Sequence, residues 1–340
     1  MRVFVSGATG FIGGHLTASL AGEGHEIHTV ARSASRAEGL RSLGARVTIG
    51  DLRDEGTVCR SMDGCEVVYH LATVRTGMSV DRLVNDPRIV AAHQGDVDAT
   101  RTVVASAVET GVRHVVYASS AGVHGRLRRI PADETHPLAP DTPHRRAKLE
   151  GERIVAQAVE EHGISAVNGR LTSIYGPGDE RAGRFFRWIA DGRFRLVGSG
   201  DIPYHYTHVA DIVQGLRLLG DRRGARGEAY LIGTDRVPTL REFLETIAEE
   251  AGVPLRRHPL PLPVFALAAG LSRRLLVPLG MRPAVIRNLE FFTLPRAFDV
   301  SRARRELGFE PSVELRDGIR DTLAWIRSTS AGAPAAEAGP

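Results

Sequence analysis

The chain has 340 residues, of which 42% are hydrophobic and 25% charged, a composition typical of globular rather than disordered proteins. Its net charge is +4, but the arginines are scattered rather than gathered into a basic block with interleaved aromatic residues, which argues against nucleic-acid binding. Two cysteines, Cys59 and Cys65, offer no metal cluster or disulfide framework and indicate a reducing compartment. With no export-signal pattern and no uninterrupted spanning stretch, we expect a cytoplasmic protein that does not enter a membrane.

The first half of the chain alternates short β-branched runs with longer amphipathic segments, which is the pattern of βαβ units. Strands are expected at 2–6, 26–30, 46–49, 66–70, 114–118 and 165–171. Helices are expected near 11–22, 34–42, 53–62, 88–111 and 143–162. Right-handed crossovers place such helices on both faces of a parallel sheet. The pattern therefore predicts an α/β protein with a Rossmann-type, doubly wound parallel sheet.

The second half is interrupted by Gly-Pro-Gly at 176–178 and by prolines around 259–263, and its alternation is weaker. It contains an expected helix near 180–192, a helix over 208–219 and a strand over 229–232. We expect a cofactor domain over 1–171, to which 208–232 returns. A smaller and mostly helical substrate lobe is expected from 172–207 and 233–328. The last residues, 329–340, are expected to form a disordered tail.

A glycine-rich turn, Gly-Ala-Thr-Gly-Phe-Ile-Gly at 7–13, follows the first strand directly and opens the first helix. Glycines allow the backbone to turn tightly and to approach a ligand closely, and the N–H groups and positive dipole end of a helix attract phosphates. The turn therefore predicts a dinucleotide site that uses Gly7, Thr9, Gly10, Phe11, Ile12 and Gly13.

The end of the second strand bears on the choice between NAD and NADP. A carboxylate at this place accepts the ribose hydroxyls of NAD, whereas this chain has Ala31, Arg32 and Ser33. Arginine pairs bidentately with phosphate, so Arg32 and Ser33 favour the 2′-phosphate of NADP over NAD. The alternative interpretation is that Arg32 is an ordinary solvent-exposed loop arginine.

Several further short motifs lie along the chain. They are Gly50-Asp51-Leu52, His70-Leu71-Ala72, Ser119-Ser120, Tyr175-Gly176-Pro177 and, near the end, Phe298-Asp299-Val300 and Leu307-Gly308-Phe309. With the glycine turn, they make nearly the whole chain resemble the extended short-chain dehydrogenase/reductases, the NAD-dependent epimerase/dehydratase family. The resemblance implies an NAD(P) cofactor, a small-molecule substrate bound between the lobes, and a homodimer formed through the helices near 88–111 and 143–162. It also implies that Asp51 and Leu52 line the adenine, and that Leu71 and Ala72 line the middle of the cofactor.

The family's catalytic residues are a Ser or Thr after the fifth strand and a Tyr-x-x-x-Lys on the next long helix. By position these are Ser120 and the run His144-Arg145-Arg146-Ala147-Lys148, in which histidine replaces the tyrosine. Asp96 stands where many members have asparagine. Lys148 is the only lysine of the chain. An ammonium bonds ribose hydroxyls as a compact charge that a guanidinium does not imitate, so Lys148 is expected to hold the nicotinamide ribose, unless its retention is chance.

The role of His144 stays open between three alternatives. Its imidazolium could act as the acid, since the ordinary pKa of histidine is about 6.5, although Lys148 one helical turn away would lower that pKa. It could instead be a neutral hydrogen-bonding or structural residue, or mark altered or lost chemistry. Tyr175, Tyr204, Tyr206 and His208 lie in segments expected to face the substrate. We expect Tyr175, Tyr206 and His208 to contact it, and no metal to take part.

The substrate lobe lacks the arginine that holds a diphosphate in family members that act on nucleotide sugars, because Ile202-Pro203-Tyr204-His205 occupies its usual place. The apolar region 259–280 resembles the branch with hydroxysteroid dehydrogenases and dihydroflavonol reductases. We therefore predict an NADP(H)-dependent oxidoreductase that acts on a ketone or alcohol of an apolar or polycyclic small molecule. The alternatives are a nucleotide-sugar epimerase or dehydratase, a non-redox lyase or cyclase of the same family, and a non-catalytic NADP-binding regulator.

Overall fold

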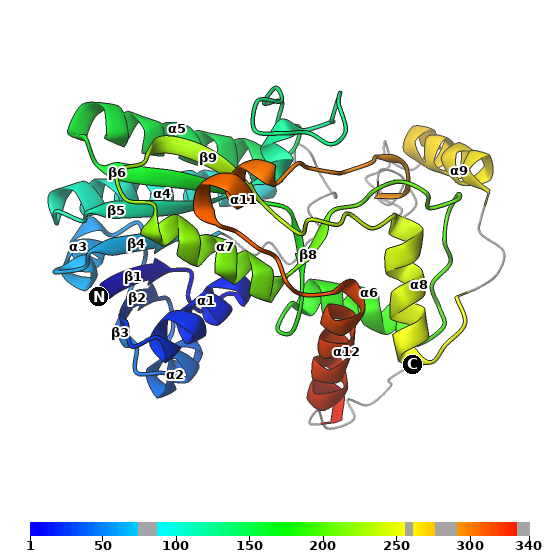
Figure 1. The fold of residues 1–340 in the computed structure, drawn as a ribbon, viewed down its shortest axis with the longest axis horizontal. Helices are drawn as coiled ribbons and strands as arrows, with labels where there is room; N and C mark the ends of the chain where they lie inside the picture. Colours follow the sequence, from blue (N-terminus) through cyan, green and yellow to red (C-terminus); the bar gives the residue numbers. More distant parts are fainter. Residues whose placement is uncertain (74–86, 256–260, 276–290, 332–340) are drawn as a thin grey trace. The chain divides into compact units, whose positions relative to one another are not determined.

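The computed structural model describes residues 1–73, 87–255, 261–275 and 291–331 (Figure 1). The chain divides into two compact units. Unit 1 comprises Met1–Ser173, Ala210–Asp235 and Phe298–Pro311, and unit 2 comprises Ile174–Val209, Arg236–Ala297 and Ser312–Pro340. Each unit is described here by itself.

Unit 1 is built on a seven-stranded sheet with the order β3-β2-β1-β4-β5-β6-β9, in which all neighbouring strands are parallel. The strands are β1 (Arg2–Ser6), β2 (Glu26–Ala31), β3 (Arg46–Ile49), β4 (Val67–His70), β5 (His114–Ser120), β6 (Ser165–Leu171) and β9 (Arg226–Ile232). The strand order reverses between β1 and β4, and in open α/β sheets such a point opens the crevice that binds ligands. The predicted Rossmann-type sheet is confirmed.

Helices cover both faces of this sheet (Figure 1). One face carries α3 (Glu55–Met62), α4 (Pro87–Glu109) and α5 (Pro143–His162), and the other carries α1 (Phe11–Gly22), α2 (Ala34–Ser42) and α7 (Val209–Asp221). Phe4, Val68 and Val115 point to the first face and pack against α3, α4 and α5. Because both faces are covered, the central strands read as nearly continuous apolar runs rather than as alternating ones.

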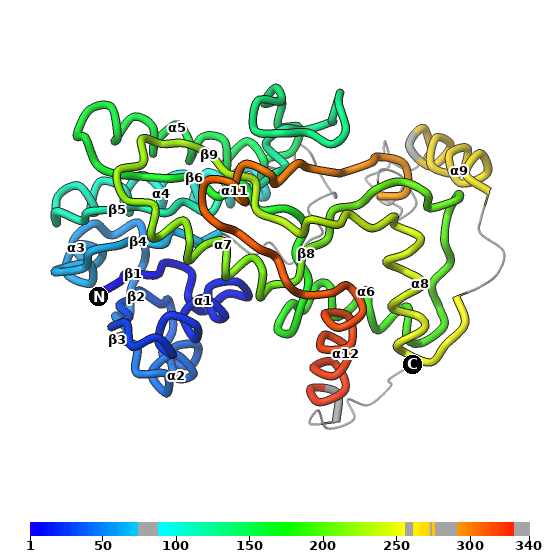
Figure 2. Tube along the Cα trace, in the orientation of Figure 1, coloured from blue at the N-terminus to red at the C-terminus, as the bar shows by residue number. Residues whose placement is uncertain are grey.

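Unit 2 is mostly helical. Its elements are a two-stranded sheet of β7 (Ser173–Tyr175) and β8 (Tyr206–His208) and the helices α6 (Glu180–Ala190), α8 (Leu240–Ala251), α9 (Leu262–Leu275) and α12 (Leu315–Ala331) (Figure 2). Its core combines aliphatic side chains with aromatic ones, among them Tyr175, Phe186 and Phe243, and α12 packs against α8 and α6. No helix within the described ranges has the length and apolar character that crossing a bilayer requires.

Most element boundaries differ from the expected ones by a few residues, and the following differences matter for the organisation of the chain. Residues 298–311, expected in the substrate lobe, belong to unit 1, because Asp299 N donates to Ala132 O (2.8 Å) and α11 (Ser301–Leu307) packs against β9. The helix expected from 208 starts at Val209, because residues 206–208 pair with β7. Residues 329–331, expected to be disordered, form the end of α12, and the rest of the expected tail, 332–340, lies outside the described residues. The homodimer through α4 and α5 stays a prediction.

Candidate active site

Two positions of the turn accept only glycine, because the backbone of the protein itself approaches them closely. Gly7 has φ 76°, and a Cβ atom added to it would lie 2.8 Å from Ala72 N; a Cβ on Gly13 would overlap the Gly7 carbonyl oxygen. Gly10 N donates to that same oxygen (2.9 Å) and Gly10 precedes α1, whose first N–H groups no side chain caps among the described residues. Uncapped amides at a helix start bind anions, so this cradle fits the pyrophosphate of a dinucleotide.

A buried chain of side chains ties the glycine turn to the end of β4. Ser6 Oγ lies 2.6 Å from His70 Nδ1 and accepts the N–H groups of Leu71 (3.2 Å) and Ala72 (3.3 Å). His70 Nε2 lies 2.9 Å from Thr100 Oγ1, which donates its own proton to a backbone carbonyl of α4 (2.8 Å). Thr100 therefore accepts from His70 Nε2–H, and Ser6 donates to Nδ1. The chain holds His70 neutral in one tautomer and fixes Leu71 and Ala72, the residues expected beside the cofactor.

We expect His70 to make the fold sensitive to acid. Burial lowers the pKa of His70 to about 3, helped by the charge of Lys148. Between that value and about 6.5, the unfolded chain binds a proton that the folded chain does not, so stability present above pH 6.5 is lost as the pH falls. His70 alone should remove about 2 kcal/mol from the free energy of unfolding by pH 5.

Urea unfolding at pH 7.5 and pH 5 measures this loss. In a His70→Asn variant, the difference in unfolding free energy between the two pH values should shrink by about 2 kcal/mol, the contribution expected from His70. His162, at the end of α5 with half of its side chain exposed, provides the matched control, and His162→Asn should leave the difference intact. An equal pH dependence in the wild type and the His70→Asn variant would contradict the assignment.

The adenosine end of the expected site is defined by the start of α2 and the loop after β3. Arg32 is exposed and Ser33 precedes α2, where the positive end of the helix dipole also favours an anion. Asp51 bonds Arg53 through both carboxylate oxygens (3.0 and 2.7 Å), and this bond lowers the pKa of Asp51 to about 2, with a smaller contribution from Arg32. No carboxylate among the described residues forms an ion pair with Arg32, which agrees with a role in holding an added phosphate.

The other end of the expected site lies where β5 finishes and α5 begins. Lys148 is 7% exposed, donates to Ala118 O (2.7 Å) and lies 5.0 Å from the centre of the Tyr117 ring. Burial lowers the pKa of Lys148 to about 8, while Asp96 and Glu152 oppose that shift. Ser120 ends β5, and its Oγ accepts the N–H of Gly122 (3.1 Å), which leaves the hydroxyl proton to be donated elsewhere. An ammonium and a hydroxyl donor thus lie on neighbouring elements.

His144 lies in the first turn of α5, and Thr142, whose Oγ1 accepts the N–H of Arg145 (3.3 Å), caps that turn. The His144 side chain is half-buried, and its ring centre lies 5.4 Å from that of His93 on α4. Sequence reasoning missed His93. Its only signal was its position three residues before Asp96, which places both side chains on one face of a helix.

The three predicted substrate residues come together inside unit 2. The ring centre of Tyr175 lies 5.5 Å from that of His208 and 6.4 Å from that of Tyr206. Tyr206 stacks on Phe243 at 4.0 Å, and burial raises the pKa of Tyr206 well above its usual value. His208 Nε2 lies 3.4 Å from Asp321. Tyr175 is part of the packed core, and contact of the three residues with a substrate stays a prediction.

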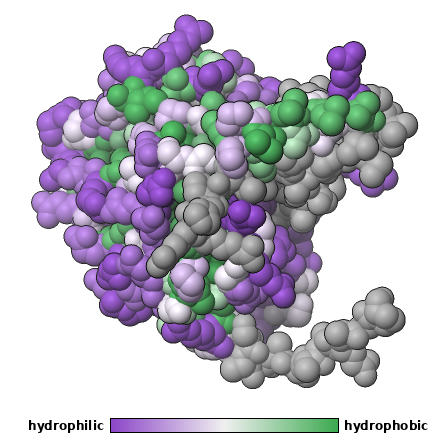
Figure 3. Space-filling model, turned by 90° about the vertical axis from the view of Figure 1, so that its right-hand side faces the viewer, coloured by the Kyte–Doolittle hydropathy of each residue, from purple (hydrophilic) through white to green (hydrophobic). Residues whose placement is uncertain are grey.

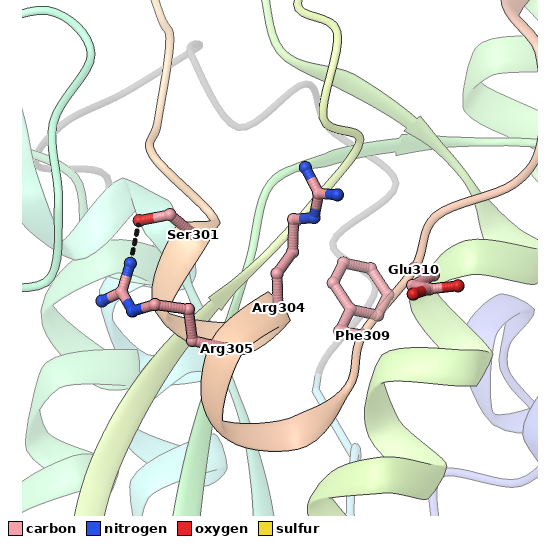
Figure 4. A pocket seen from close by; sticks show the side chains of 5 residues that line it. All are labelled: Ser301, Arg304, Arg305, Phe309 and Glu310. Atoms are coloured by element: carbon pink, nitrogen blue, oxygen red, sulfur yellow. Dashed lines mark hydrogen bonds between the residues drawn. The ribbon is translucent and has the colours of Figure 1, made fainter.

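An open pocket of about 320 Å³ lies elsewhere in unit 1, along α11 (Figure 4). It is lined by Ser301, Arg304, Arg305, Phe309 and Glu310. Arg305 bonds Ser301 (2.9 Å), and Arg304 pairs with Asp235 (2.7 Å). None of the predicted site residues lines this pocket, so it has no part in the site. Within the described ranges, no cluster of three or more His, Cys, Asp or Glu side chains could hold a metal ion.

The parallel sheet, the uncapped glycine turn and its fit to a pyrophosphate define a dinucleotide-binding protein of the Rossmann type. Residues 3–233 match the NAD dependent epimerase/dehydratase family, and the chain belongs to that family. Its members are NAD(P)-dependent oxidoreductases, epimerases and dehydratases, so the protein is an enzyme of the extended short-chain dehydrogenase/reductase type.

Three similar proteins cover nearly the whole chain. A 4-hydroxy-2-methyl-3-oxo-4-farnesyl-3,4-dihydroquinoline-1-oxide ketoreductase of Stigmatella aurantiaca is 31% identical, over 94% of this chain and 95% of the relative. Sterol demethylase protein B of Methylococcus capsulatus is 29% identical, over 96% and 98%. The crystal structure of gox2253 superimposes with a TM-score of 0.81 at 26% identity, over 96% of this chain and 98% of the other.

Proposed function

We propose that the protein is an NADP(H)-dependent oxidoreductase that acts on a ketone or alcohol of an apolar or polycyclic small molecule. The observation that supports this proposal is that Lys148 of α5 bonds Ala118 near the end of β5, the strand that Ser120 ends, with His144 in the first turn of α5. A relative 31% identical is named as a ketoreductase of a farnesylated ring, and another is named for sterols.

The surface of unit 2 supports an apolar ligand. One face of α9 exposes Val264, Leu267, Leu271 and Leu275, at helical spacing and between 55% and 74% exposed. Figure 3 shows hydrophobic side chains gathered in a band among polar ones. Apolar side chains in such number on one helix face mark a binding surface more often than an ordinary solvent-exposed face.

The chain's own groups suit carbonyl reduction. Bound NADPH supplies the hydride. The glycine turn would hold its pyrophosphate, Arg32 and Ser33 its 2′-phosphate, and Lys148 its nicotinamide ribose. Ser120, whose Oγ already accepts Gly122 N–H, would donate a hydrogen bond to the carbonyl oxygen and orient it, while keeping its proton. His144 would supply the proton that the oxygen takes up as its negative charge develops.

The proposal predicts that purified protein oxidises NADPH in the presence of apolar cyclic ketones, which the loss of absorbance of the reduced nicotinamide measures. His144→Phe should lower kcat by about a hundredfold, because general acid catalysis contributes about that much or more. His144→Tyr should retain much of the rate with a changed pH profile. Full activity in the His144→Phe variant would exclude His144 as the proton donor, and turnover of nucleotide sugars but not of apolar ketones would refute the proposed substrate class.

The preference for NADP should depend on Arg32. Arg32→Ala should raise the Kd for NADP about 10- to 100-fold, since a bidentate charged bond to phosphate is worth about 1.5–3 kcal/mol. The Kd for NAD should stay nearly unchanged, because NAD has no 2′-phosphate. The matched control is Arg41, which is exposed in the last turn of α2, the helix that follows Arg32. Arg41→Ala should alter neither the Kd for NADP nor the Kd for NAD. Titration of cofactor fluorescence measures both, and equal losses for NAD and NADP would contradict the role of Arg32.

A further inference from the structure

Two histidines and a carboxylate from α4 and α5 form a cluster beside Lys148. His93 is 5% exposed, and its Nδ1 lies 3.0 Å from Asp96 Oδ2. The same carboxylate oxygen accepts a hydrogen bond from Thr73 Oγ1 (2.9 Å). The centre of the His93 ring lies 5.4 Å from that of His144, with the planes inclined by 58°. Asp96, His93 and His144 therefore follow one another in space.

For His144 to act as an acid, a nearby carboxylate has to offset the effects that oppose protonation of its imidazole. His144 is half-buried and has Lys148 one turn further along α5, and both burial and a like charge oppose protonation of an imidazole. Within the described ranges, the charged and titratable groups of this cluster are His93 and Asp96 on α4 and Lys148 on α5, and Lys148 in turn interacts with Glu152 on α5 and with the neutral His70 on β4. The negative charge of Asp96 favours protonation of the groups around it, because it opposes the lowering of the pKa of Lys148 by burial.

The hydrogen bond to Asp96 also sets the tautomer of His93. A carboxylate accepts, so the proton of neutral His93 lies on Nδ1, and Nε2 is left as an acceptor on the other side of the ring. A carboxylate behind an imidazole stabilises the protonated ring and orients it. Asp96 thus holds in place the ring that lies against His144.

We propose that Asp96 and His93 are positioning residues that hold a hydrogen-bonded ring and a negative charge beside His144 and so keep His144 able to act as an acid. This inference rests on the proposed function. When His144 gives its proton to the substrate oxygen, an N–H bond breaks and an O–H bond forms. His144 is then neutral, and a proton from water restores it.

The test is a titration of the histidine signals by NMR in the cofactor-free protein, with His144 assigned by its loss in a His144→Gln variant. Asp96→Asn keeps the shape of the side chain and removes its charge, so it should lower the pKa of His144 by about one unit. His93→Phe keeps a ring against His144 and should also lower that pKa. In the His93→Phe background, Asp96→Asn should have little further effect, because the connecting ring is gone.

The half-exposed His162, at the end of α5, serves as the internal control, and its signals should not change with substitutions at positions 93 and 96. An Asp96→Asn shift of equal size with and without His93→Phe would overturn the proposal, as would a pKa of His144 that neither substitution changes. If Asp96→Asn does not fold, the His93→Phe titration alone decides, since an unchanged pKa of His144 there also overturns the proposal. These titrations need no turnover, so they separate failure of the cluster from failure of the proposed ketone reduction.

Discussion

We expect Lys148→Met to lower kcat/KM for ketone reduction by about a thousandfold, the usual order of loss when a preorganised charged donor is removed. Methionine keeps an unbranched apolar stem beside the Tyr117 ring and removes only the ammonium, which bonds Ala118 O. The same variant should raise the Kd for NADP, because the ribose hydroxyls lose their charged partner. Steady-state kinetics and fluorescence titration give the two values, and thermal unfolding confirms that the variant is folded.

The pH dependence of cofactor binding provides the control for this effect. Burial lowers the pKa of Lys148 to about 8, so its charge is present below that pH and lost above it. Affinity of the wild-type protein for NADP should therefore weaken as the pH rises through 8, and the Lys148→Met variant should lack this dependence. Lys148→Arg keeps the positive charge but carries it on a wider, planar group, so this variant should also bind NADP weakly. If the Lys148→Arg variant bound NADP as tightly as the wild-type protein, the compact shape of the lysine ammonium would not be what cofactor binding requires.

The elements of unit 1 could be predicted because their signals are local. The helix expected over 143–162 has those bounds in the structure, since Thr142 caps its start and Gly163, at φ 67°, ends it in a left-handed conformation. The strand expected over 2–6 is likewise found as β1, buried from Val3 to Ser6. Caps, turn glycines and apolar runs act within a few residues, so the sequence alone reveals them.

What could not be predicted depends on partners that are distant in the chain. Residues 298–311 belong to unit 1 through the pairing of Ala132 with Phe298, which no periodicity announces. The contact of His93 with His144 likewise joins two helices whose mutual packing becomes visible only in the fold. The family pattern pointed to Ser120 and Lys148 by position, whereas it gave no signal for His93.

A buried ion pair behind the site should have the largest effect on stability. Arg170 on β6 bonds both oxygens of Glu152 on α5, at 3.0 and 2.8 Å, and the two side chains are only 7% and 8% exposed. Glu152 also accepts the hydroxyl of Ser119 (2.5 Å), the residue before Ser120. Arg170→Met would leave this carboxylate buried without its counter-charge, which should cost about 3–5 kcal/mol of unfolding free energy.

Urea unfolding separates the charge from the packing. The double variant Arg170→Met, Glu152→Met removes both charges and should recover most of the loss, since apolar residues of similar volume often replace a buried pair without penalty. Arg153 and Glu150, an exposed pair on the same helix with 68% and 41% of the side chains accessible, form the matched control. Arg153→Met should cost less than about 1 kcal/mol. If Arg170→Met proved no more harmful than Arg153→Met, the Glu152 carboxylate would have to be neutralised in another way, and the support of Ser119 by a charged Glu152 would fall with it.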